Sequence, residues 1–499
     1  MNKIQTPYNS LQHLEYLAHQ LNCWDKVAVV DHNRKLTYRE IYSLSRKFGI
    51  ALLNSGICTG DQILVCLPDS ADFITVFLGC LFTGIIPVVI NPAFGQTEIN
   101  EIVQKSTAKN VICTEAKSKH FYQRGWNLIL ITDSDCCGMS VDRYAVQFHK
   151  DIETPVTLAN DDAFIYCTSG TTGQTKLVMH LQKSICGTGL QYGTGILKVT
   201  SRDVIFSAAK LSHAYGLGNS LSIPFTHGAT VILESELPTP DCITQHIQQH
   251  GVTIFCGVPR HYTSLLSYNR SVNIDSLRIC LSAGESLPKQ VGQDFSSKYN
   301  VDIIDAIGST ELLGFALSTS SDTIVYGTTG KPVDGCEIKL VDNGHEVIGA
   351  GVGELYVKSP YAATKYFNDP ESTEYTFKDG WIKTNDMYQR DADGNFVHYG
   401  RQNDCIKVNA VYVSLTMLEK SLYNIKSVAD SAAVSYTNKY GLNRIKICVV
   451  LHQGYDSQTE YVRILKSIKT NEQIRIPFII KFVDSIPRTV SGKIKKYML

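Results

Sequence analysis

Residues 166–180, YCTSGTTGQTKLVMH, gather glycines, Ser/Thr hydroxyls and a lysine directly after an apolar run. Glycine weakens strands and helices, so this composition does not suit a scaffold element. A Gly-Ser/Thr loop at the carboxyl end of a parallel strand exposes backbone N–H groups and hydroxyls that can wrap an anion. The spacing differs from the GxxxxGK[ST] pattern of a P-loop, so a Walker-type site is not indicated. A phosphate-binding loop and a flexible surface loop both stay open at this point.

Three further segments carry residues suited to the same chemistry. DAIGSTE (305–311) follows the strand candidate VDII with a glycine, two hydroxyls and a carboxylate. WIKTND (381–386) supplies an aspartate suited to sugar hydroxyls, and SGKIKK (491–496) places a lysine in a glycine turn. A single exposed Lys or Asp is usually just solvated, but the four segments in this order favour a site for a charged nucleotide.

The first 270 residues contain the elements that would position these segments. A capping box from Thr37 to Glu40 predicts a helix that ends at Gly56. Nearly continuous apolar runs then alternate with helical patterns, which predicts parallel strands covered on both faces of a large α/β body. The strand candidates are QILVCL, NVICT, DDAFIYCT, DVIFSA, ATVILE, VTIFCGVP and LRICLSAGE.

Residues 71–90 form the longest apolar stretch and need a membrane test. Because they include Asp72, Gly79 and Pro87, a buried helix ending near Gly84 and a buried strand IIPVVI explain them better than a transmembrane span.

The first ten residues lack the apolar core of a signal peptide. Fifteen cysteines, mostly in apolar runs, then favour reduced core thiols and a cytoplasmic protein.

The charge of the chain is balanced, with 47 Lys+Arg and 47 Asp+Glu. This balance gives no indication of nucleic-acid binding or of attraction to an anionic membrane surface.

After about residue 325 the strand candidates become shorter and hairpin turns appear at DNG and DADG. We predict an N-terminal domain at residues 1–400 that includes a small β-barrel-like lobe, a hinge at 401–404, and a small mobile α+β domain at 405–499. The 499 residues suffice for a large core divided in this way.

The ordered segments resemble the AMP-forming adenylating enzymes: acyl- and aryl-CoA ligases, adenylation domains of peptide synthetases, and luciferases. YCTSGTTGQTK resembles their phosphate loop, SAGE (282–285) and DAIGSTE their adenine and magnesium segments, and GRQND (400–404) their hinge. PRTVSGKIKK resembles the loop with the catalytic lysine, and the likeness covers essentially the whole chain. Within the family, AAKLSHAYGLGN (208–219) and SAGESLP are most similar to benzoate- and hydroxybenzoate-CoA ligases.

The resemblance implies that a carboxylic acid attacks the α-phosphate of ATP with Mg²⁺ bound, and that the acyl group then passes to coenzyme A. Because both reactants are anions, the site must neutralise charge and hold an in-line geometry. The β/γ-phosphates are expected on Ser169, Gly170, Thr171, Thr172, Gly173 and Lys176, the α-phosphate on Thr310, and Mg²⁺ on Glu311. The remaining nucleotide contacts are expected from Ala283, Gly284, Glu285, Asp305, Ala306, Ile307, Gly308, Ser309, Asp386 and Arg401.

Lys493 is the expected catalytic lysine, which would offset charge in the transition state of adenylation. In the family the small domain carries this lysine to ATP and rotates afterwards, which is gating by domain motion. Asn403 stands at the expected hinge position. Lys407 contacts the nucleotide or acceptor, or is simply a solvated lysine; both interpretations are kept.

The resemblance places the acyl pocket at His213, Ala214, Tyr215, Gly216, Gly308 and Gly314. His213 either flanks the carboxylate entry or is an ordinary core histidine. Benzoate ligases tend to carry a bulkier residue where Gly314 stands, so a deeper or differently shaped pocket is expected here.

Several positions depart from the family pattern. Asn385 replaces the usual glycine of TGD, and we expect it to take a positive φ, which Asn tolerates well. Ala410, Leu415 and Met417 replace a usual Gly, Pro and Glu near the tunnel for the pantetheine arm. The methyl of Ala410 would narrow this tunnel, so coenzyme A, a carrier-protein phosphopantetheine and another acceptor all stay open.

Three functions follow, each with its own test. An acyl/aryl-CoA ligase releases AMP with CoA alone, whereas an adenylating enzyme that loads an acyl carrier protein needs the holo-carrier. A nucleotide-binding pseudoenzyme does neither, and the retained Glu311, Asp386 and Lys493 argue against it.

Overall fold

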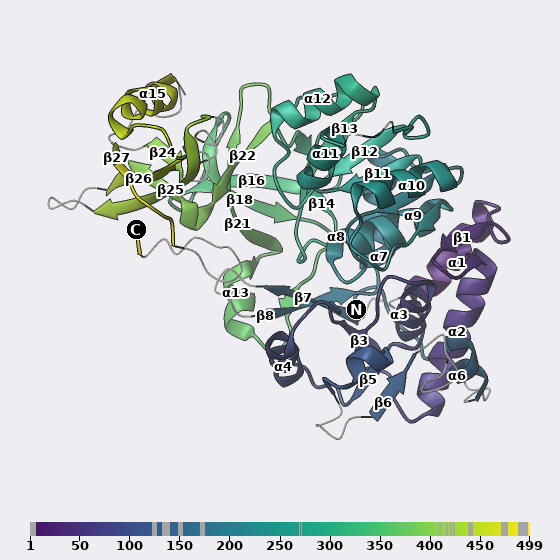
Figure 1. Ribbon diagram of the computed structural model, residues 1–499. Coiled ribbons are helices and arrows are strands. Elements are labelled where there is room, and N and C mark those ends of the chain that lie inside the picture. Colours follow the sequence, from purple (N-terminus) through teal and green to yellow (C-terminus); the bar gives the residue numbers. More distant parts are fainter. Residues whose placement is uncertain are drawn as a thin grey trace. The chain divides into compact units, whose positions relative to one another are not determined.

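The computed structural model describes residues 6–121, 127–131, 140–147, 153–169, 175–268, 270, 272–408, 411–415, 418–419, 422, 425–437, 443–470, 478–487 and 498–499 (Figure 1). The chain divides into two compact units. The first comprises Met1–Ile338 and Val357–Lys383, and the second comprises Lys339–Tyr356 and Thr384–Leu499. The two units are defined by their compactness, which does not identify a hinge. The hinge at 401–404 therefore stays a prediction.

A seven-stranded sheet occupies one half of the first unit, in the order β19-β8-β7-β4-β3-β5-β6. Its central strands are parallel, as their apolar runs predict, whereas β8 and β19 run antiparallel. The strands are β3 (Gln62–Cys66), β4 (Ile86–Val89), β5 (Asn110–Cys113), β6 (Asn127–Leu130), β7 (Asp162–Ser169), β8 (Thr175–Leu181) and β19 (Lys365–Tyr366).

The helices of this half bury their apolar faces in two hydrophobic clusters. The capping box predicted at Thr37 and Glu40 starts α2 (Tyr38–Asn54), and Gly84 ends the fully buried α3 (Ala71–Thr83) with a φ of 68°. The accompanying helices are α1 (Ser10–Gln20), α4 (Gln96–Lys105), α5 (Glu115–Ser118) and α6 (Val141–Gln147). One cluster takes the apolar faces of α1, α2, α3 and α6, and the other takes that of α4. Among the described residues, no helix has the length and apolar character needed to cross a membrane.

A nine-stranded sheet occupies the other half, in the order β15-β14-β13-β12-β11-β9-β10-β1-β2. Strands β1, β10, β9, β11, β12 and β13 are parallel, and antiparallel strands lie at both edges. The bounds are β1 (Val27–Val30), β2 (Lys35–Thr37), β9 (Val204–Ser207), β10 (Thr230–Ile232), β11 (Ile254–Gly257), β12 (Ile279–Ser282), β13 (Ile303–Gly308), β14 (Phe315–Ser318) and β15 (Lys331–Pro332).

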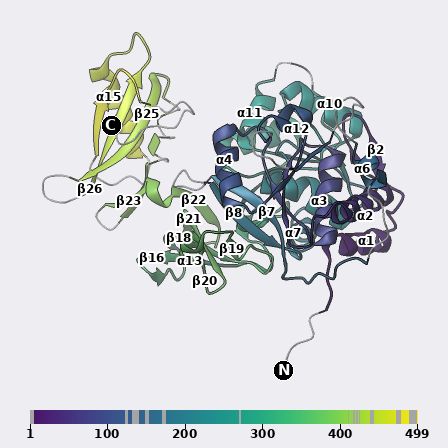
Figure 2. The same ribbon diagram turned by 90° about the horizontal axis from the view of Figure 1, so that it is seen from below.

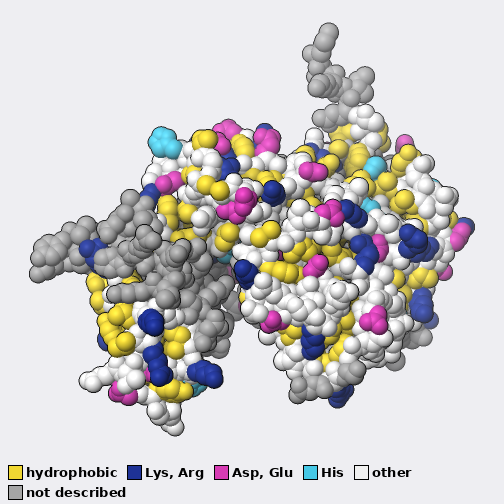
Figure 3. All heavy atoms as spheres, turned by 90° about the horizontal axis from the view of Figure 1, so that it is seen from above, with side chains coloured by type: hydrophobic (Ala, Val, Ile, Leu, Met, Phe, Trp, Pro, Cys, Tyr) yellow, Lys and Arg dark blue, Asp and Glu magenta, His cyan; other side chains and the backbone are white. Residues whose placement is uncertain are grey.

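Helices cover this sheet as well. In Figure 2 α10 (Pro240–His250), α11 (Pro259–Leu266) and α12 (Lys289–Tyr299) gather on one side of the first unit. The other helical segments are α7 (Ser184–Gly195), α8 (Ala214–Leu217), the π-helical Gly218–Ser222 and α9 (Ile223–His227). Positive and negative side chains are interspersed over the face seen in Figure 3, in line with the balanced charge.

A further sheet has the order β17-β16-β18-β21-β20, with β22 paired to β21. Asn343 and Gly344, at φ of 49° and 82°, form the predicted turn between β16 and β17. Its elements are β16 (Glu337–Asp342), β17 (His345–Glu346), β18 (Gly351–Lys358), α13 (Pro370–Thr376), β20 (Phe377–Lys378), β21 (Trp381–Arg390) and β22 (Phe396–Arg401).

The second unit ends in small sheets. β23 (Cys405–Val408) pairs with β24 (Val411–Ser414), and β25 (Val428–Thr437), β26 (Asn443–Leu451) and β27 (Phe478–Phe482) form a three-stranded sheet with α15 (Ser457–Thr470). Leu415, which replaces a usual proline, packs in the core of this unit. Part of the predicted helix at 414–425 lies outside the described residues.

Three strands extend further than their apolar runs indicate. β13 continues through Asp305 to Gly308, and β21 continues through Asp386, so these residues lie within strands and not after them. Lys176 lies in β8 and not in the loop. Antiparallel partners cause the extension, because pairing with β14, β22 and β7 supplies ladder hydrogen bonds to polar residues.

Candidate active site

A cavity of about 190 Å³ lies in the first unit where the two large sheets end. Cys167 belongs to β7, Gly284 follows β12, and Gly308 ends β13, so the cavity sits at the carboxyl ends of parallel strands, where ligands of open α/β sheets bind. Its lining is Cys167, His213, Ala214, Tyr215, Gly218, Ala283, Gly284, Gly308, Ser309, Thr310, Leu313, Gly314 and Phe315. Most of these are predicted site residues.

Tyr366 contacts two predicted site residues at once. Its hydroxyl donates a hydrogen bond of 2.7 Å to Oε1 of Glu311, and Nζ of Lys176 lies 4.6 Å from its ring centroid. Burial, followed by the nearby Glu311 carboxylate, raises the pKa of Tyr366, so the phenol stays protonated and remains a donor. The contact brings the candidate magnesium ligand and the candidate phosphate lysine to one place.

His213 lies at the mouth of the cavity and is held by Asn91. Asn91 Oδ1 accepts a hydrogen bond from the N–H of Ala93 at 2.9 Å, which leaves Nδ2 to face His213 Nε2 at 3.0 Å. Nδ2 is a donor, so Nε2 accepts and the proton of the imidazole is assigned to Nδ1. The side chain is open to solvent on the cavity side, but protein surrounds it elsewhere, and this burial lowers its pKa.

Tyr215 lines the cavity, and Asp305 is buried in β13. The Tyr215 hydroxyl donates to the carbonyls of Gly257 and Leu281 at 2.9 and 3.0 Å, so it ties α8 to the ends of β11 and β12. Burial raises the pKa of Asp305 well above its usual range. Ala306 is buried with it in β13, while Ile307 is half-buried.

Glycines let the backbones close around the cavity. A Cβ at Gly308 would lie 2.3 Å from the carbonyl oxygen of Gly314, and one at Gly216 would lie 1.9 Å from that of Lys210. A Cβ at Gly314 would meet Cγ2 of Thr188 at 3.2 Å, so Thr188 lies against this side of the pocket. Gly284 has a φ of 85° and turns the chain after β12, and Glu285 beside it is exposed.

In the second unit, Asp386 and Arg401 stand directly opposite each other on β21 and β22. The Arg401 guanidinium lies 3.2 Å from one Asp386 oxygen, and His398 Nε2 lies 3.4 Å from the other. Asn385 has a φ of 58°, which confirms the conformation expected for the glycine substitute. The two predicted ribose residues are therefore neighbours, and His398 joins them.

Lys407 forms an ion pair within the second unit. Its Nζ lies 2.7 Å from Asp342 Oδ2, and the Tyr412 hydroxyl donates to the other Asp342 oxygen at 2.7 Å. Hydrogen bonds from Lys407 and Tyr412 lower the pKa of Asp342. Lys407 is thus an ion-pair partner here and not a freely solvated lysine.

Several predicted site residues lie outside the described part of the chain. They are Gly170, Thr171, Thr172 and Gly173 of the phosphate loop, together with Lys493 and Ala410. Ser169 ends β7, and Asn403 lies in a short 3₁₀ helix at Gln402–Asp404. The roles of all these residues stay predictions.

Comparison with known proteins decides the family. The model of the AMP-binding enzyme family matches residues 18–367. The chain belongs to this family. It is 34% identical to the benzoate–CoA ligase of Thauera aromatica over 95% of this chain and 92% of that protein. The resemblance read from the motifs is confirmed.

Solved structures of AMP-binding enzymes share the fold. A benzoate CoA ligase from Burkholderia xenovorans LB400 superimposes with a TM-score of 0.83 at 33% identity, covering 98% of this chain and 99% of that one. The anthranilate CoA ligase AuaEII in complex with anthranoyl-AMP gives a TM-score of 0.85 at 27% identity, with coverage of 99% and 96%. The predicted α/β fold class is confirmed.

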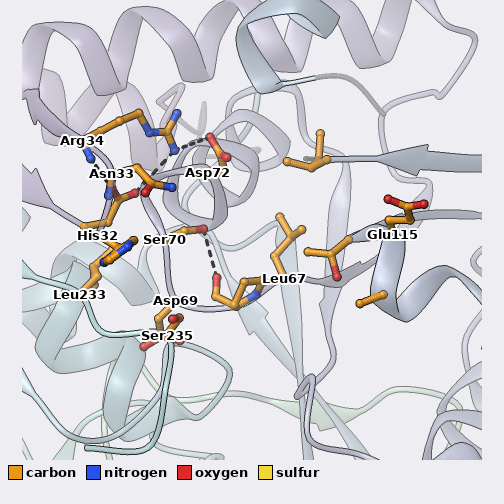
Figure 4. Close-up of a pocket in the computed structure, with 15 residues that line it drawn as sticks. His32, Asn33, Arg34, Leu67, Asp69, Ser70, Asp72, Glu115, Leu233 and Ser235 are labelled. Atoms are coloured by element: carbon orange, nitrogen blue, oxygen red, sulfur yellow. Dashed lines mark hydrogen bonds and ion pairs between the residues drawn. The ribbon is translucent and has the colours of Figure 1, made fainter. Parts of the chain in front are cut away.

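This AMP-binding enzyme has a second, larger cavity of about 550 Å³ at the carboxyl ends of β1, β3, β5 and β10 (Figure 4). Arg34 there forms an ion pair of 2.8 Å with Asp72. Asp69 accepts the Leu211 N–H at 3.0 Å, and burial raises its pKa to about 7. None of the described residues predicted for the site lines this larger cavity, whereas several of them line the smaller one.

The residues that the motifs missed are Tyr366, Asn91, Thr188 and His398. Tyr366, Thr188 and His398 belong to none of the segments that the motif analysis singled out, so no motif pointed to them. Asn91 had a weak signal, since it follows the predicted strand IIPVVI at its carboxyl end.

Proposed function

We propose that the protein activates an aromatic carboxylic acid with ATP and transfers it to coenzyme A. The acid attacks the α-phosphate to give an acyl-adenylate and pyrophosphate, and the CoA thiol then displaces AMP to give the thioester. The observation that carries this proposal is the cavity at the strand ends with Lys176, Tyr366 and Glu311 gathered within the same unit. The family and the benzoate ligase relatives support it.

The side chains near the cavity suit the charge problem of adenylation. Glu311 is a hard oxygen donor of the kind that Mg²⁺ prefers, and Mg²⁺ bound there would neutralise phosphate charge. The Tyr366 hydroxyl fixes one Glu311 oxygen, which leaves the second oxygen for the ion. Lys176, held over the Tyr366 ring, contributes a second positive charge for the departing pyrophosphate.

The cavity size supports an acid with a single ring. An apolar cavity of about 150 Å³ accommodates benzene, and this cavity measures about 190 Å³. Phe315, Leu313 and Tyr215 offer apolar surface, and the neutral His213 at the mouth does not repel or trap a carboxylate. Thr188 fills part of the space that Gly314 leaves open.

The acceptor is assigned to coenzyme A on the basis of the relatives' activity. Loading of a carrier-protein phosphopantetheine is the second candidate, and it rests on the departures at Ala410 and Leu415. The two acceptors share the same thiol chemistry, so only the second half-reaction separates them.

The test begins with pyrophosphate exchange into ATP in the presence of benzoate, anthranilate or hydroxybenzoates. We expect exchange that depends on the acid, and a loss of about 100-fold or more in Glu311→Gln, whereas the exposed Glu346→Gln should exchange like the parent. Addition of CoA to the active mixture should release AMP and the aryl-CoA. Absence of exchange with every aromatic acid would contradict the substrate class, and thioester formation only with a holo-carrier would contradict the acceptor.

A further inference from the structure

Three side chains of types that bind metal ions, Glu234, Cys242 and His246, form a cluster outside the candidate active-site cavity. Glu234 follows β10, and Cys242 and His246 lie on α10, where a spacing of four residues places them on the same helical face. One ligand atom from each residue lies within 4.8 Å of the other two. Thr239 caps the helix through a hydrogen bond from the Cys242 N–H, which holds the first turn in place.

Two of the three distances within the cluster are close to those around a tetrahedral cation. Oε2 of Glu234 lies 3.4 Å from the Cys242 sulfur and 3.0 Å from Nε2 of His246. Around Zn²⁺ with ordinary Zn–S, Zn–N and Zn–O bonds, tetrahedral ligand atoms are about 3.3 to 3.6 Å apart. The cluster therefore needs shifts of only a few tenths of an ångström at these two edges.

The Glu234 carboxylate is oriented to bind a cation through one oxygen. Its other oxygen, Oε1, accepts the Glu236 N–H at 2.9 Å, so Oε2 alone faces Cys242 and His246. The imidazole of His246 also packs on Phe206, with 4.8 Å between ring centroids, which fixes its direction.

We propose that Glu234, Cys242 and His246 bind one Zn²⁺ ion, with solvent in the fourth position. The ion takes the lone pairs of the Glu234 carboxylate, the neutral His246 Nε2 and the Cys242 thiolate, and the thiol proton passes to solvent. The two anionic ligands balance the charge of the ion, and the sulfur and nitrogen donors select zinc over Mg²⁺. This site does not depend on the proposed ligase activity.

A metal at this position would brace the connection between β10 and α10. Nζ of Lys210 donates to the backbone carbonyls of Glu234 and Glu236, so the same segment is tied to the loop that leads to His213. Leu233 and Ser235, on either side of Glu234, line the larger cavity. Bound zinc would therefore stabilise one wall of the larger cavity.

The first measurement uses Co²⁺ as a spectroscopic substitute for Zn²⁺ in the full-length protein. We expect one equivalent of Co²⁺ to give a thiolate charge-transfer band in the near ultraviolet and visible bands typical of tetrahedral coordination, and Zn²⁺ to displace it. Titration with Zn²⁺ in weakly buffered solution should release about one proton per ion at neutral pH, because a thiol is mostly protonated there and must lose its proton to bind the ion.

The variants separate this site from nonspecific binding to other cysteines. Cys242→Ser should lose the charge-transfer band and Glu234→Gln should weaken Co²⁺ binding at least tenfold, whereas Cys58→Ser, at an exposed cysteine, should bind like the parent. Zn²⁺ should raise the unfolding midpoint of the parent and of Cys58→Ser but not that of Cys242→Ser. An unchanged band in Cys242→Ser, or the lack of any one-equivalent tetrahedral complex, would overturn the proposal.

Discussion

Tyr366 connects Glu311 and Lys176, two residues that separate motifs had suggested for the same reaction. Neither its position nor its role follows from those motifs, because β19 joins the sheet from almost two hundred residues further along the chain than β8. Charge and glycine patterns identified the groups that would face ATP. The groups that orient them come from pairings of distant segments, which a single sequence does not reveal.

Removal of the Tyr366 hydroxyl tests this connection. Tyr366→Phe keeps the ring beneath Lys176 but removes the hydrogen bond to Glu311, and hydrogen bonds to charged groups contribute about 1.5–3 kcal/mol. We expect pyrophosphate exchange to fall by roughly 10- to 100-fold and the requirement for Mg²⁺ to rise. The exposed Tyr16→Phe serves as the control. Parental exchange at low Mg²⁺ in Tyr366→Phe would show that the hydroxyl does not position Glu311.

His213 offers a pH test at the mouth of the cavity. Burial holds its pKa below the usual 6.5, so in the parent the imidazole is neutral above that pH. Asn91→Asp places a carboxylate about where Nδ2 now lies, and an opposite charge at this range raises a pKa by about 1–3 units. Protonation of His213 should then persist to higher pH.

The pH profile of kcat/KM for the acid measures this shift. We expect an inflection from His213 below pH 6.5 in the parent and a clearly higher one in Asn91→Asp, whereas Asn91→Ala should move it little. Superimposable profiles of the parent and Asn91→Asp would mean that His213 does not affect acid binding.

At the scale of elements, α8 depends on a close backbone approach. A Cβ at Gly216 would lie 1.9 Å from the Lys210 carbonyl oxygen, and backbone cannot move aside as a flexible side chain can. Gly216→Ala should therefore shift α8 and reduce the free energy of unfolding by roughly 3 kcal/mol or more. Gly218→Ala is the matched control, since its nearest neighbour would lie at 3.9 Å.

Denaturant unfolding of both variants checks this prediction, and Gly218→Ala should unfold within about 1 kcal/mol of the parent. Because α8 carries Tyr215, Gly216→Ala should also weaken acid binding. Equal stability of the two variants would show that the 208–213 loop relaxes without cost.

The parallel strands were predictable from their apolar runs, because a strand buried on both faces needs apolar residues at every position. β3, β4, β9, β11 and β12 lie where these runs stand. The extensions of β13 and β21 were not predictable, since their added residues are polar or small and are held by antiparallel partners. Asp305 and Asp386 lie in these extensions, so the strands themselves carry predicted nucleotide contacts.

At the scale of the whole molecule, the chain has two compact units, and the predicted catalytic groups are distributed over both. The cavity, Lys176 and Glu311 belong to the first, whereas Asp386, Arg401 and the 3₁₀ segment with Asn403 belong to the second. The change in strand texture after about residue 325 led to the prediction of a small domain at 405–499, and this boundary stays a prediction. The division by compactness also assigns 339–356 to the second unit, a pairing that sequence order cannot show.

The two half-reactions should depend on different residues of the second unit. Lys493→Ala should lower acid-dependent pyrophosphate exchange by about 100-fold or more, because the lysine would offset charge between two reacting anions. Transfer to CoA from a supplied aryl-adenylate involves no such anion pair at the lysine, so Lys493→Ala should retain this step. Ala410→Gly should instead affect only the transfer step. Pyrophosphate exchange should stay unchanged, and thioester formation should be equally fast or faster, since glycine widens the expected tunnel. Single-turnover assays of each half-reaction measure both effects, and equal losses in both steps for Lys493→Ala would contradict a role confined to adenylation.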